Sequence, residues 1–292
     1  MKLITCYENG NAMVYLYDDG TKVRLWPDNE DYRPEYPESC DVTIQTKCSQ
    51  GCPYCYLGCS MDGKYADFSK YEFLDHMHPG MELAINIQLP LHPNLDDFLQ
   101  KMSDQGVIVN ATVNQDHFTI LKDKLHECVD KKLLYGIGVS YLREDPRLIT
   151  DLKEFPNAIV HVIAGIIQRD DLEFLADHGL KLLVLGYKNL GRARDNEDYF
   201  CNVQDNINNL SEFLPIIKDR FEIISFDNLA LEQLSVRKWV DPAVWAESYM
   251  GEEGLATFFL DLVNGRFAQS SLSQDLRDIN NLSLKMMFSM IH

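Results

Sequence analysis

The organisation of this chain follows from one stretch, Asp41-Val42-Thr43-Ile44-Gln45-Thr46, which runs directly into Lys47-Cys48-Ser49-Gln50-Gly51-Cys52-Pro53-Tyr54-Cys55-Tyr56. The first six residues alternate like a β-strand. The next ten hold three thiols, and the Gly and Pro among them predict a loop rather than a helix. Because ligands of α/β folds bind at the carboxyl ends of strands, the arrangement predicts a ligand site around these thiols.

The thiols of Cys48, Cys52 and Cys55 are soft ligands, which favour an iron–sulfur cluster, zinc or Cu(I) over hard cations such as Mg²⁺. A [4Fe-4S] cluster normally takes four thiolates, so three local thiols would leave one iron without a protein ligand. An open coordination position is what a catalytic metal centre needs. The alternatives are a zinc site completed by Cys40, Cys59 or a His, and free thiols.

The spacing Cys48-x-x-x-Cys52-x-x-Cys55, with Tyr54 just before the last thiol, resembles the cluster loop of the radical S-adenosylmethionine (radical SAM) enzymes. The resemblance implies that the open iron binds the amino and carboxylate groups of SAM and that Tyr54 packs near its adenine. Reductive cleavage of SAM would then give methionine and a 5′-deoxyadenosyl radical, which abstracts hydrogen from a substrate. An electron donor such as a flavodoxin or ferredoxin is the implied partner.

The composition limits the class of protein. The chain has 292 residues, 46% of them hydrophobic and 25% charged, which predicts a globular α/β domain with room for a small appendage. No apolar run reaches membrane-span length and the amino end lacks a signal-peptide pattern, so we expect no membrane association and a cytoplasmic location. The formal net charge of −18 makes nucleic acid an unlikely partner.

The cysteines outside the loop are scattered and do not form a small disulfide framework, which fits a reducing compartment. We expect Cys6, Cys128 and Cys201 to be free, buried thiols. With Cys201 alone near the end of the chain, there is no second cysteine cluster of the kind that peptide-modifying relatives often have.

Three regions are predicted from the pattern of the chain. Residues 1–37 read as a β-meander with strands at 2–6, 12–17 and 21–26, followed by a linker. Residues 38–240 alternate between strands and helices. Residues 241–292 predict a hairpin at 256–263 and 267–271 and an amphipathic helix over 276–292.

The central region predicts a parallel sheet with helical crossovers. Beyond the strand before the thiols, strands are expected at 82–89, 107–113, 133–141, 159–166, 181–187 and 222–226. Helices are expected at 68–77, 95–103, 118–129, 170–178 and 205–218. About seven β/α units in a row favour a partial or near-complete TIM-like (β/α)6-7 barrel, which is also the fold that the resemblance implies.

The resemblance also implies where SAM would lie. The second barrel strand of the family ends in a Gly-Gly-Glu-like segment that holds the amino group of SAM, but the corresponding residues 84–93 lack both the glycines and the acid. Strand pleating puts Asn86 and Gln88 on one side of the strand. Their amides could replace the missing segment by hydrogen-bonding SAM, although such hydrogen bonds are weaker than an ion pair.

Later strands supply the other expected SAM contacts. Asn114 ends the third strand, and Ser140 lies where the family often has a ribose or carboxylate contact. Ile163 and Gly165 match the family's adenine-flanking Gly-x-Ile-x-Gly-x-x-Glu segment, although its first Gly and final Glu are replaced. The replacements are His161, which we expect to be a packed histidine, and Gln168. Candidates for substrate contacts, on the far wall of the site, are Tyr187, Lys188, Asp227 and Asn228. Asp227 is equally suited to cap a helix.

The sequence therefore predicts a radical SAM enzyme with one [4Fe-4S] cluster, acting on a small-molecule or peptide substrate. The alternative is a non-catalytic iron–sulfur or zinc module that senses redox state on a radical SAM scaffold, which the missing Gly-Gly-Glu segment supports.

Overall fold

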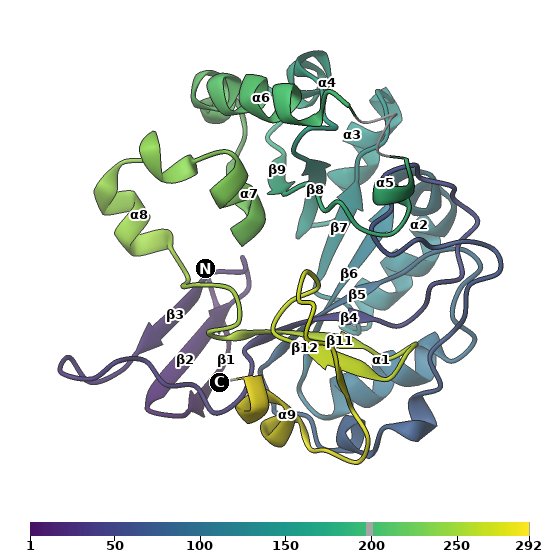
Figure 1. Cartoon of the computed structure of the whole chain (residues 1–292), viewed down its shortest axis with the longest axis vertical. Coiled ribbons are helices and arrows are strands. Elements are labelled where there is room, and N and C mark those ends of the chain that lie inside the picture. The colour runs from purple at the N-terminus through teal and green to yellow at the C-terminus, as the bar shows by residue number, and fades with distance from the viewer. Residues whose placement is uncertain (197–200, 292) are drawn as a thin grey trace.

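A computed structural model describes residues 1–196 and 201–291 of the chain (Figure 1). It is a mixed α/β protein, as predicted, with a small and a large sheet. The small sheet contains β1 (Leu3–Asn9), β2 (Ala12–Tyr17) and β3 (Lys22–Leu25). The large sheet contains β4 (Ser39–Thr43), β5 (Glu82–Asn86), β6 (Ile108–Asn114), β7 (Gly136–Ser140), β8 (Ala158–Ile163), β9 (Lys181–Leu185), β10 (Ile223–Phe226), β11 (Thr257–Asp261), β12 (Arg266–Ala268) and β13 (Arg277–Asp278).

The strands of the large sheet follow the order β10-β9-β8-β7-β6-β5-β4-β11-β12-β13. From β4 to β10 neighbouring strands are parallel and consecutive in the chain. The described helices are α1 (Leu95–Asp104), α2 (Gln115–Asp130), α3 (Pro146–Leu152), α4 (Arg169–Leu175), α5 (Arg192–Asp195), α6 (Val203–Ile217), α7 (Asn228–Gln233), α8 (Pro242–Ser248) and α9 (Leu284–Ile291). None of these helices has the length and apolar run required to cross a bilayer.

The two faces of the large sheet differ in chemistry because side chains alternate along each strand. On β5, Leu83 and Ile85 are fully buried, whereas Ala84 and Asn86 face a cavity on the other side. The same alternation continues on β6, where Val109, Ala111 and Val113 are buried. Helices therefore cover the apolar face, while the opposite face carries small and polar side chains that can line a site.

The helices pack through regularly spaced apolar residues. In α1, Leu95, Phe98, Leu99 and Met102 are buried and fall on one face of the helix. α3 begins with the N-cap Asp145 and Pro146 at its first turn, a favourable start because Pro needs no hydrogen-bond acceptor there. The helix expected at 95–103 is confirmed as α1, whereas α3 was not predicted from the sequence.

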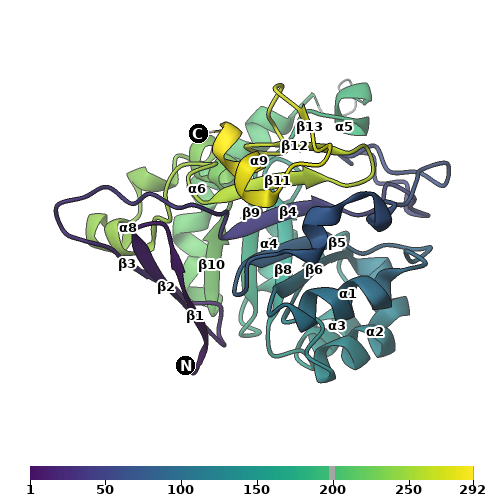
Figure 2. The same ribbon diagram turned by 90° about the horizontal axis from the view of Figure 1, so that it is seen from below.

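The small sheet lies on the side of the large sheet away from α1 and α2 (Figures 1 and 2). Its β2–β3 turn, Asp18 to Gly20, borders a second cavity of about 340 Å³ at the amino ends of the large sheet's strands. Asn157 donates to the Asp18 carbonyl oxygen at 3.1 Å. The predicted β-meander thus covers the inner face of the large sheet.

Two predicted helices are partly wrong. Residues 68–77 form two 3₁₀ turns, Phe68–Lys70 and Glu72–Asp75, because Tyr71 between them has φ −120° and ψ 88°. Of the helix expected at 276–292 only α9 is helical, since β13 pairs with β12 and Asn280 has φ +45°. His292 lies outside the described residues.

The predicted C-terminal hairpin forms as β11 and β12, but it is not separate from the central region. β11 pairs in parallel with β4, with Thr257 opposite Ser39 and Asp261 opposite Thr43. The strand before the thiols therefore has neighbours on both sides, β5 and β11.

The small and large sheets are joined through a buried carboxylate, Glu38. Arg24 donates to both of its oxygens, at 2.7 and 2.8 Å, and the Tyr32 hydroxyl donates at 2.5 Å. Lys22 lies between Glu38 and Glu82, at 3.4 and 2.6 Å. Burial acts to raise the pKa of Glu38, but hydrogen bonds from Arg24 and the charge of Lys22 outweigh it, so the pKa is lowered.

We expect Glu38→Gln to lower the free energy of unfolding at pH 7 by about 3–5 kcal/mol, because it leaves the buried Arg24 without its carboxylate. The lowered pKa means that this stabilisation is present above the unfolded pKa and is lost as the pH falls through the folded one. Urea unfolding of both proteins at several pH values measures the difference. Glu35→Gln, which breaks only an exposed pair with Lys285, is the control and should change little. An equal effect of the two variants would contradict the prediction.

Candidate metal centre and cofactor cavity

A cavity of about 330 Å³ lies at the carboxyl ends of the parallel strands, on the sheet face away from the helices. The three predicted metal ligands, Cys48, Cys52 and Cys55, all line it. So do six of the seven predicted cofactor residues: Tyr54, Asn86, Gln88, Asn114, Ser140 and Ile163. The prediction that the thiols and these strand ends meet in one place is confirmed.

Gly165 is the exception. Its φ is +81°, and a Cβ there would lie 2.8 Å from the Val203 side chain and 3.2 Å from that of Ile207, both on α6. The Gly165 carbonyl oxygen accepts a hydrogen bond from Asn206 at 3.1 Å. This glycine permits close packing of the β8–α4 turn against a helix, and its expected place in the cofactor cavity is wrong.

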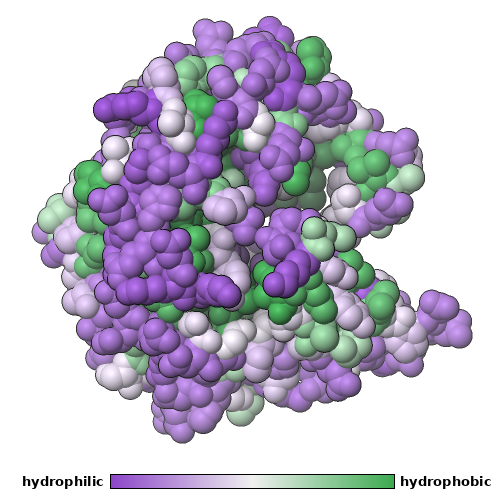
Figure 3. Space-filling view, turned by 180° about the vertical axis from the view of Figure 1, so that it is seen from behind, coloured by the Kyte–Doolittle hydropathy of each residue, from purple (hydrophilic) through white to green (hydrophobic). Residues whose placement is uncertain are grey.

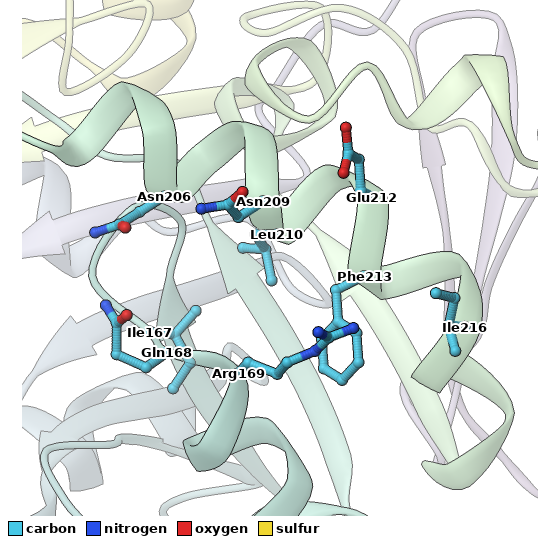
Figure 4. Close-up of a pocket in the computed structure, with 9 residues that line it drawn as sticks. All are labelled: Ile167, Gln168, Arg169, Asn206, Asn209, Leu210, Glu212, Phe213 and Ile216. Atoms are coloured by element: carbon cyan, nitrogen blue, oxygen red, sulfur yellow. The ribbon is translucent and has the colours of Figure 1, made fainter.

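Gln168 also points away from the thiols. Its side chain belongs to the capping box of α4, and it lies in a groove of about 430 Å³ between α4 and α6, where Arg169 stacks on Phe213 (Figure 4). The groove is the largest of the described cavities, but it contains no thiol and only Arg169 and Glu212 as charged residues. The chemistry of the thiols is confined to the other side of the sheet.

Buried Gln45 fixes the start of the cysteine loop. Its side-chain nitrogen donates to the carbonyl oxygens of Lys47, Gln88 and Pro90, at 2.8, 3.1 and 3.1 Å. The backbone nitrogen of Ser49 donates to the Leu89 carbonyl oxygen at 2.7 Å. The loop is thereby tied to the segment that follows β5, which explains why both segments reach the same cavity.

His117 at the start of α2 links the same segments. The Leu89 backbone nitrogen donates to its Nδ1 at 3.2 Å, so Nε2 carries the ring proton and donates to the Ser49 hydroxyl at 3.0 Å. Burial lowers the pKa of His117, which favours this neutral form. Nothing in the local sequence around His117 indicated this role.

The far end of the cysteine loop is held by Arg192. Its guanidinium donates to the carbonyl oxygen of Cys52 at 2.8 Å and to that of Cys59. Its backbone nitrogen donates to the carbonyl oxygen of Cys55 at 3.0 Å. Gly191 before it has φ +53°, and a Cβ there would lie 2.4 Å from the Tyr56 carbonyl oxygen. Only glycine allows this approach. Sequence reasoning missed the pair because it lies about 140 residues from the thiols.

The thiols differ in their electrostatic setting. Burial raises the pKa of Cys48 and raises that of Cys52 to about 11, while a hydrogen bond with Cys59 lowers the pKa of Cys55 to about 6. The charge of Arg192 lowers the pKa of all three. A cation beside three thiols favours their thiolate form, which is the form that binds metal.

All eight cysteines are free, but Cys6 and Cys201 are exposed, so the expectation that they are buried is wrong, whereas Cys128 is buried as expected. Of the two considered as a fourth ligand, Cys59 lines the cavity, whereas Cys40 is buried and does not. In the described residues no three His, Cys, Asp or Glu side chains are grouped to hold a single metal ion. The thiolates of a cluster bind different irons, so they need not crowd around one point as zinc ligands do at about 2.3 Å.

The predicted amides face the cavity side, but they contact the protein's own backbone. Asn86 accepts from the Ile44 nitrogen at 2.9 Å and donates to the Gln45 carbonyl oxygen at 2.7 Å. Gln88 donates to the same carbonyl oxygen at 3.2 Å and to the Cys59 sulfur at 3.5 Å. Asn114 caps α2 by accepting from the His117 nitrogen at 2.9 Å. These amides therefore position the cysteine loop and α2.

The far wall has mixed roles. Tyr187 and Lys188 line the cavity, as expected. Asp227 is the N-cap of α7 and also accepts from the Gly186 nitrogen at 2.9 Å, so the capping alternative is confirmed. Asn228 begins α7 and donates to the Gly251 carbonyl oxygen at 3.4 Å. Hydrophobic residues gather around a hollow between the parts that carry α7–α8 and β1–β3 (Figure 3).

We expect Arg192→Gln to loosen the cysteine loop, because the shorter side chain leaves at least one of the two carbonyl oxygens without a donor, at a cost of about 1–3 kcal/mol. Hydrogen exchange read by mass spectrometry should show faster exchange over residues 50–60. Arg194→Gln, which alters an exposed side chain two residues away, is the matched control. Unchanged exchange in Arg192→Gln would contradict this role.

No protein-family model matches the sequence, and no curated protein is similar to it. The function therefore has to be inferred from the chemistry of the cavity.

Proposed function

We propose that this chain is a radical SAM enzyme that uses one [4Fe-4S] cluster and SAM to abstract hydrogen from a small-molecule or peptide substrate. The observation that supports this most is that Cys48, Cys52 and Cys55, from one loop, all line a single cavity at the carboxyl ends of parallel strands. Three thiols that line one cavity suit a metal centre that also has to bind a second molecule.

The proposed fold is a partial TIM-like (β/α) barrel. Seven parallel strands, β4 to β10, follow one another in chain order with their helices on one face, as in a barrel. The cavity lies at their carboxyl ends, where such folds have their active sites. The small sheet β1–β3 would close the amino end of the inner face.

The donor set fits the cluster. Cys48, Cys52 and Cys55 would ligate three irons, and Arg192 would offset the negative charge of the assembly while it holds the loop. When bound, the cluster and SAM together supply the 5′-deoxyadenosyl radical.

The chain itself would orient SAM and exclude water. Tyr54, Leu142, Ile163, Leu185 and Phe259 give the cavity an apolar lining, which suits an adenine and protects a reactive species from solvent. The Ser140 hydroxyl also lines the cavity and is suited to a ribose or carboxylate contact. In the described residues the side-chain oxygen of Gln88, Oε1, accepts no hydrogen bond, so it can accept one from the SAM ammonium.

The wider setting belongs to the same proposal. An exposed iron requires a reducing compartment, for which the cytoplasm is the simplest choice, and a flavodoxin or ferredoxin would supply the electron. The net charge of −18 opposes a nucleic-acid substrate.

A second candidate is a non-catalytic iron–sulfur or zinc module that senses redox state. It is favoured by the amides of Asn86 and Gln88, which are engaged with the Ile44 and Gln45 backbone where the radical SAM family has a free acid. Such a protein would bind its metal centre and leave SAM intact.

Anaerobic reconstitution followed by SAM and dithionite separates the two candidates. We expect release of 5′-deoxyadenosine, and we expect Cys48→Ala, Cys52→Ala and Cys55→Ala each to lose it together with most of the bound iron and sulfide. Cys201→Ala is the control, because Cys201 is exposed and lies outside the cavity.

Cys59→Ala provides the sharpest comparison, since Cys59 is the remaining thiol in the cavity. The proposal expects this variant to keep its iron and its SAM cleavage, because three thiolates suffice. Loss of metal from Cys59→Ala, or a bound cluster without any SAM cleavage, would contradict the proposed enzyme.

A further inference from the structure

A second cavity adjoins the one that contains the thiols. It has a volume of about 340 Å³ and lies at the amino ends of the strands, between the large sheet and the β2–β3 turn of the small sheet. Four residues of the large sheet line both cavities: Ala84, Thr112, His161 and Leu183. The two cavities therefore meet along the inner face of the large sheet, and these four residues form the junction between them.

The junction is open because most of its residues are small. In a closed (β/α) barrel, bulky branched side chains fill the interior in layers. Here β5 contributes Ala84 and β6 contributes Thr112, which is paired with Gly138 on β7. A Cβ at Gly138 would lie 2.1 Å from Cε1 of His161, so this glycine leaves room for the imidazole ring to lie over β7. The space inside the sheet is thus continuous past His161.

His161 is a buried side chain without a partner at this junction. It is 9% exposed, and among the residues that the structure describes neither of its ring nitrogens forms a hydrogen bond. Protein atoms enclose Nδ1, whereas Nε2 retains accessible surface and can be reached by a ligand. Burial lowers the pKa of His161 to about 4, so the ring is neutral at pH 7. Buried polar groups normally have a hydrogen-bond partner, and here a ligand can supply it.

The tautomer of His161 decides what kind of atom the ligand presents. A neutral imidazole carries its proton on one nitrogen and a lone pair on the other. A proton on the enclosed Nδ1 would have no acceptor, and buried N–H groups without an acceptor are costly. The proton therefore belongs on Nε2, which donates to an oxygen of the ligand.

The cavity at the amino ends is suited to an uncharged, apolar group. Its apolar lining comes from both sheets and includes Ile4, Leu16, Ile108, Ile159 and Leu183. The charged residues that line it are already engaged. Glu82 pairs with Lys22 at 2.6 Å, Lys181 donates to a backbone carbonyl oxygen, and Asp18 and Asp19 accept from backbone nitrogens. A ligand therefore finds apolar surface here and no charge that lacks a partner.

We propose that the substrate is an uncharged, elongated molecule with an apolar tail in the amino-end cavity and an oxygen that accepts a hydrogen bond from Nε2 of His161. This inference rests on the proposed function, because SAM would occupy the cavity around the thiols and the substrate would meet it at the junction. β6 lines both cavities from Ile108 to Asn114, a rise of ~20 Å, so a chain of that length can follow the inner face.

The test titrates N-butylacetamide and N-octylacetamide into the full chain with ¹³C-labelled isoleucine methyl groups, followed by NMR. We expect nuclear Overhauser effects between the octyl tail and the methyl groups of Ile108 and Ile159, and none to the exposed Ile120. The octyl compound should bind at least about tenfold more tightly than the butyl compound, because each buried methylene adds to the affinity. Equal affinities, or tail contacts confined to Ile163 in the thiol cavity, would overturn the proposal.

Two substitutions test the hydrogen bond from His161. His161→Leu removes the donor and should weaken the binding of both amides about fivefold, whereas His161→Gln keeps an amide donor and should restore most of the affinity. His178→Leu, at an exposed histidine outside both cavities, is the matched control. Equal losses in His161→Leu and His161→Gln would mean that the ring acts by packing alone and would overturn its role. The contacts to Ile108 and Ile159 are measured in the wild type, so they test the site even if a variant fails to fold.

The proposed function can fail separately from this site. Both measurements are repeated on the reconstituted protein, with SAM and dithionite added. Tail contacts to Ile108 and Ile159 without release of 5′-deoxyadenosine would contradict the proposed enzyme and support the site. Release of 5′-deoxyadenosine from a protein in which the tail makes no contact with Ile108 or Ile159 would overturn this inference alone.

Discussion

The structure depends on holding one loop, residues 47–59, at the carboxyl ends of the parallel strands. Gln45 donates to the Lys47 carbonyl oxygen at the start of the loop and to those of Gln88 and Pro90 after β5, and Arg192 donates to those of Cys52 and Cys59 near the loop's end. These contacts replace the regular hydrogen bonds that a loop lacks, and they must be made because buried carbonyl groups are costly to leave without donors. The thiols reach the cavity as a consequence.

The large sheet can line the cavity because one of its faces packs against the helices and the other is left to carry polar side chains. Leucine, isoleucine and valine residues fill the face under the helices, so the inner face can carry Asp41, Thr112, Asn114 and Ser140 without loss of the core. The small sheet then covers the amino end of this face. A ligand would meet thiols and an apolar lining within one space, and this combination is the basis of the proposed chemistry.

Local signals could be predicted from the sequence and long-range contacts could not. Thiol spacing, strand alternation and amphipathic helices depend on neighbouring residues, so the consecutive parallel strands and the shared position of the thiols with Asn86 and Ser140 were predicted, whereas the pairing of β11 with β4 was not. Arg192 and His117 were missed because their partners are distant in sequence. Gly165 was misplaced because its positive φ and its contact with α6 have no signature in the strand itself. The backbone conformation of Tyr71, which divides the helix predicted at 68–77 into two 3₁₀ turns, was missed for a similar reason.

The central claim is that the three thiols hold a cluster whose open iron binds SAM. Electron paramagnetic resonance of the anaerobically reconstituted, reduced protein tests it most directly, with spectra recorded before and after SAM is added. The account predicts a reduced [4Fe-4S] signal that changes when SAM binds. A protein that contains zinc instead of iron, or a cluster signal that SAM leaves unchanged, would contradict it.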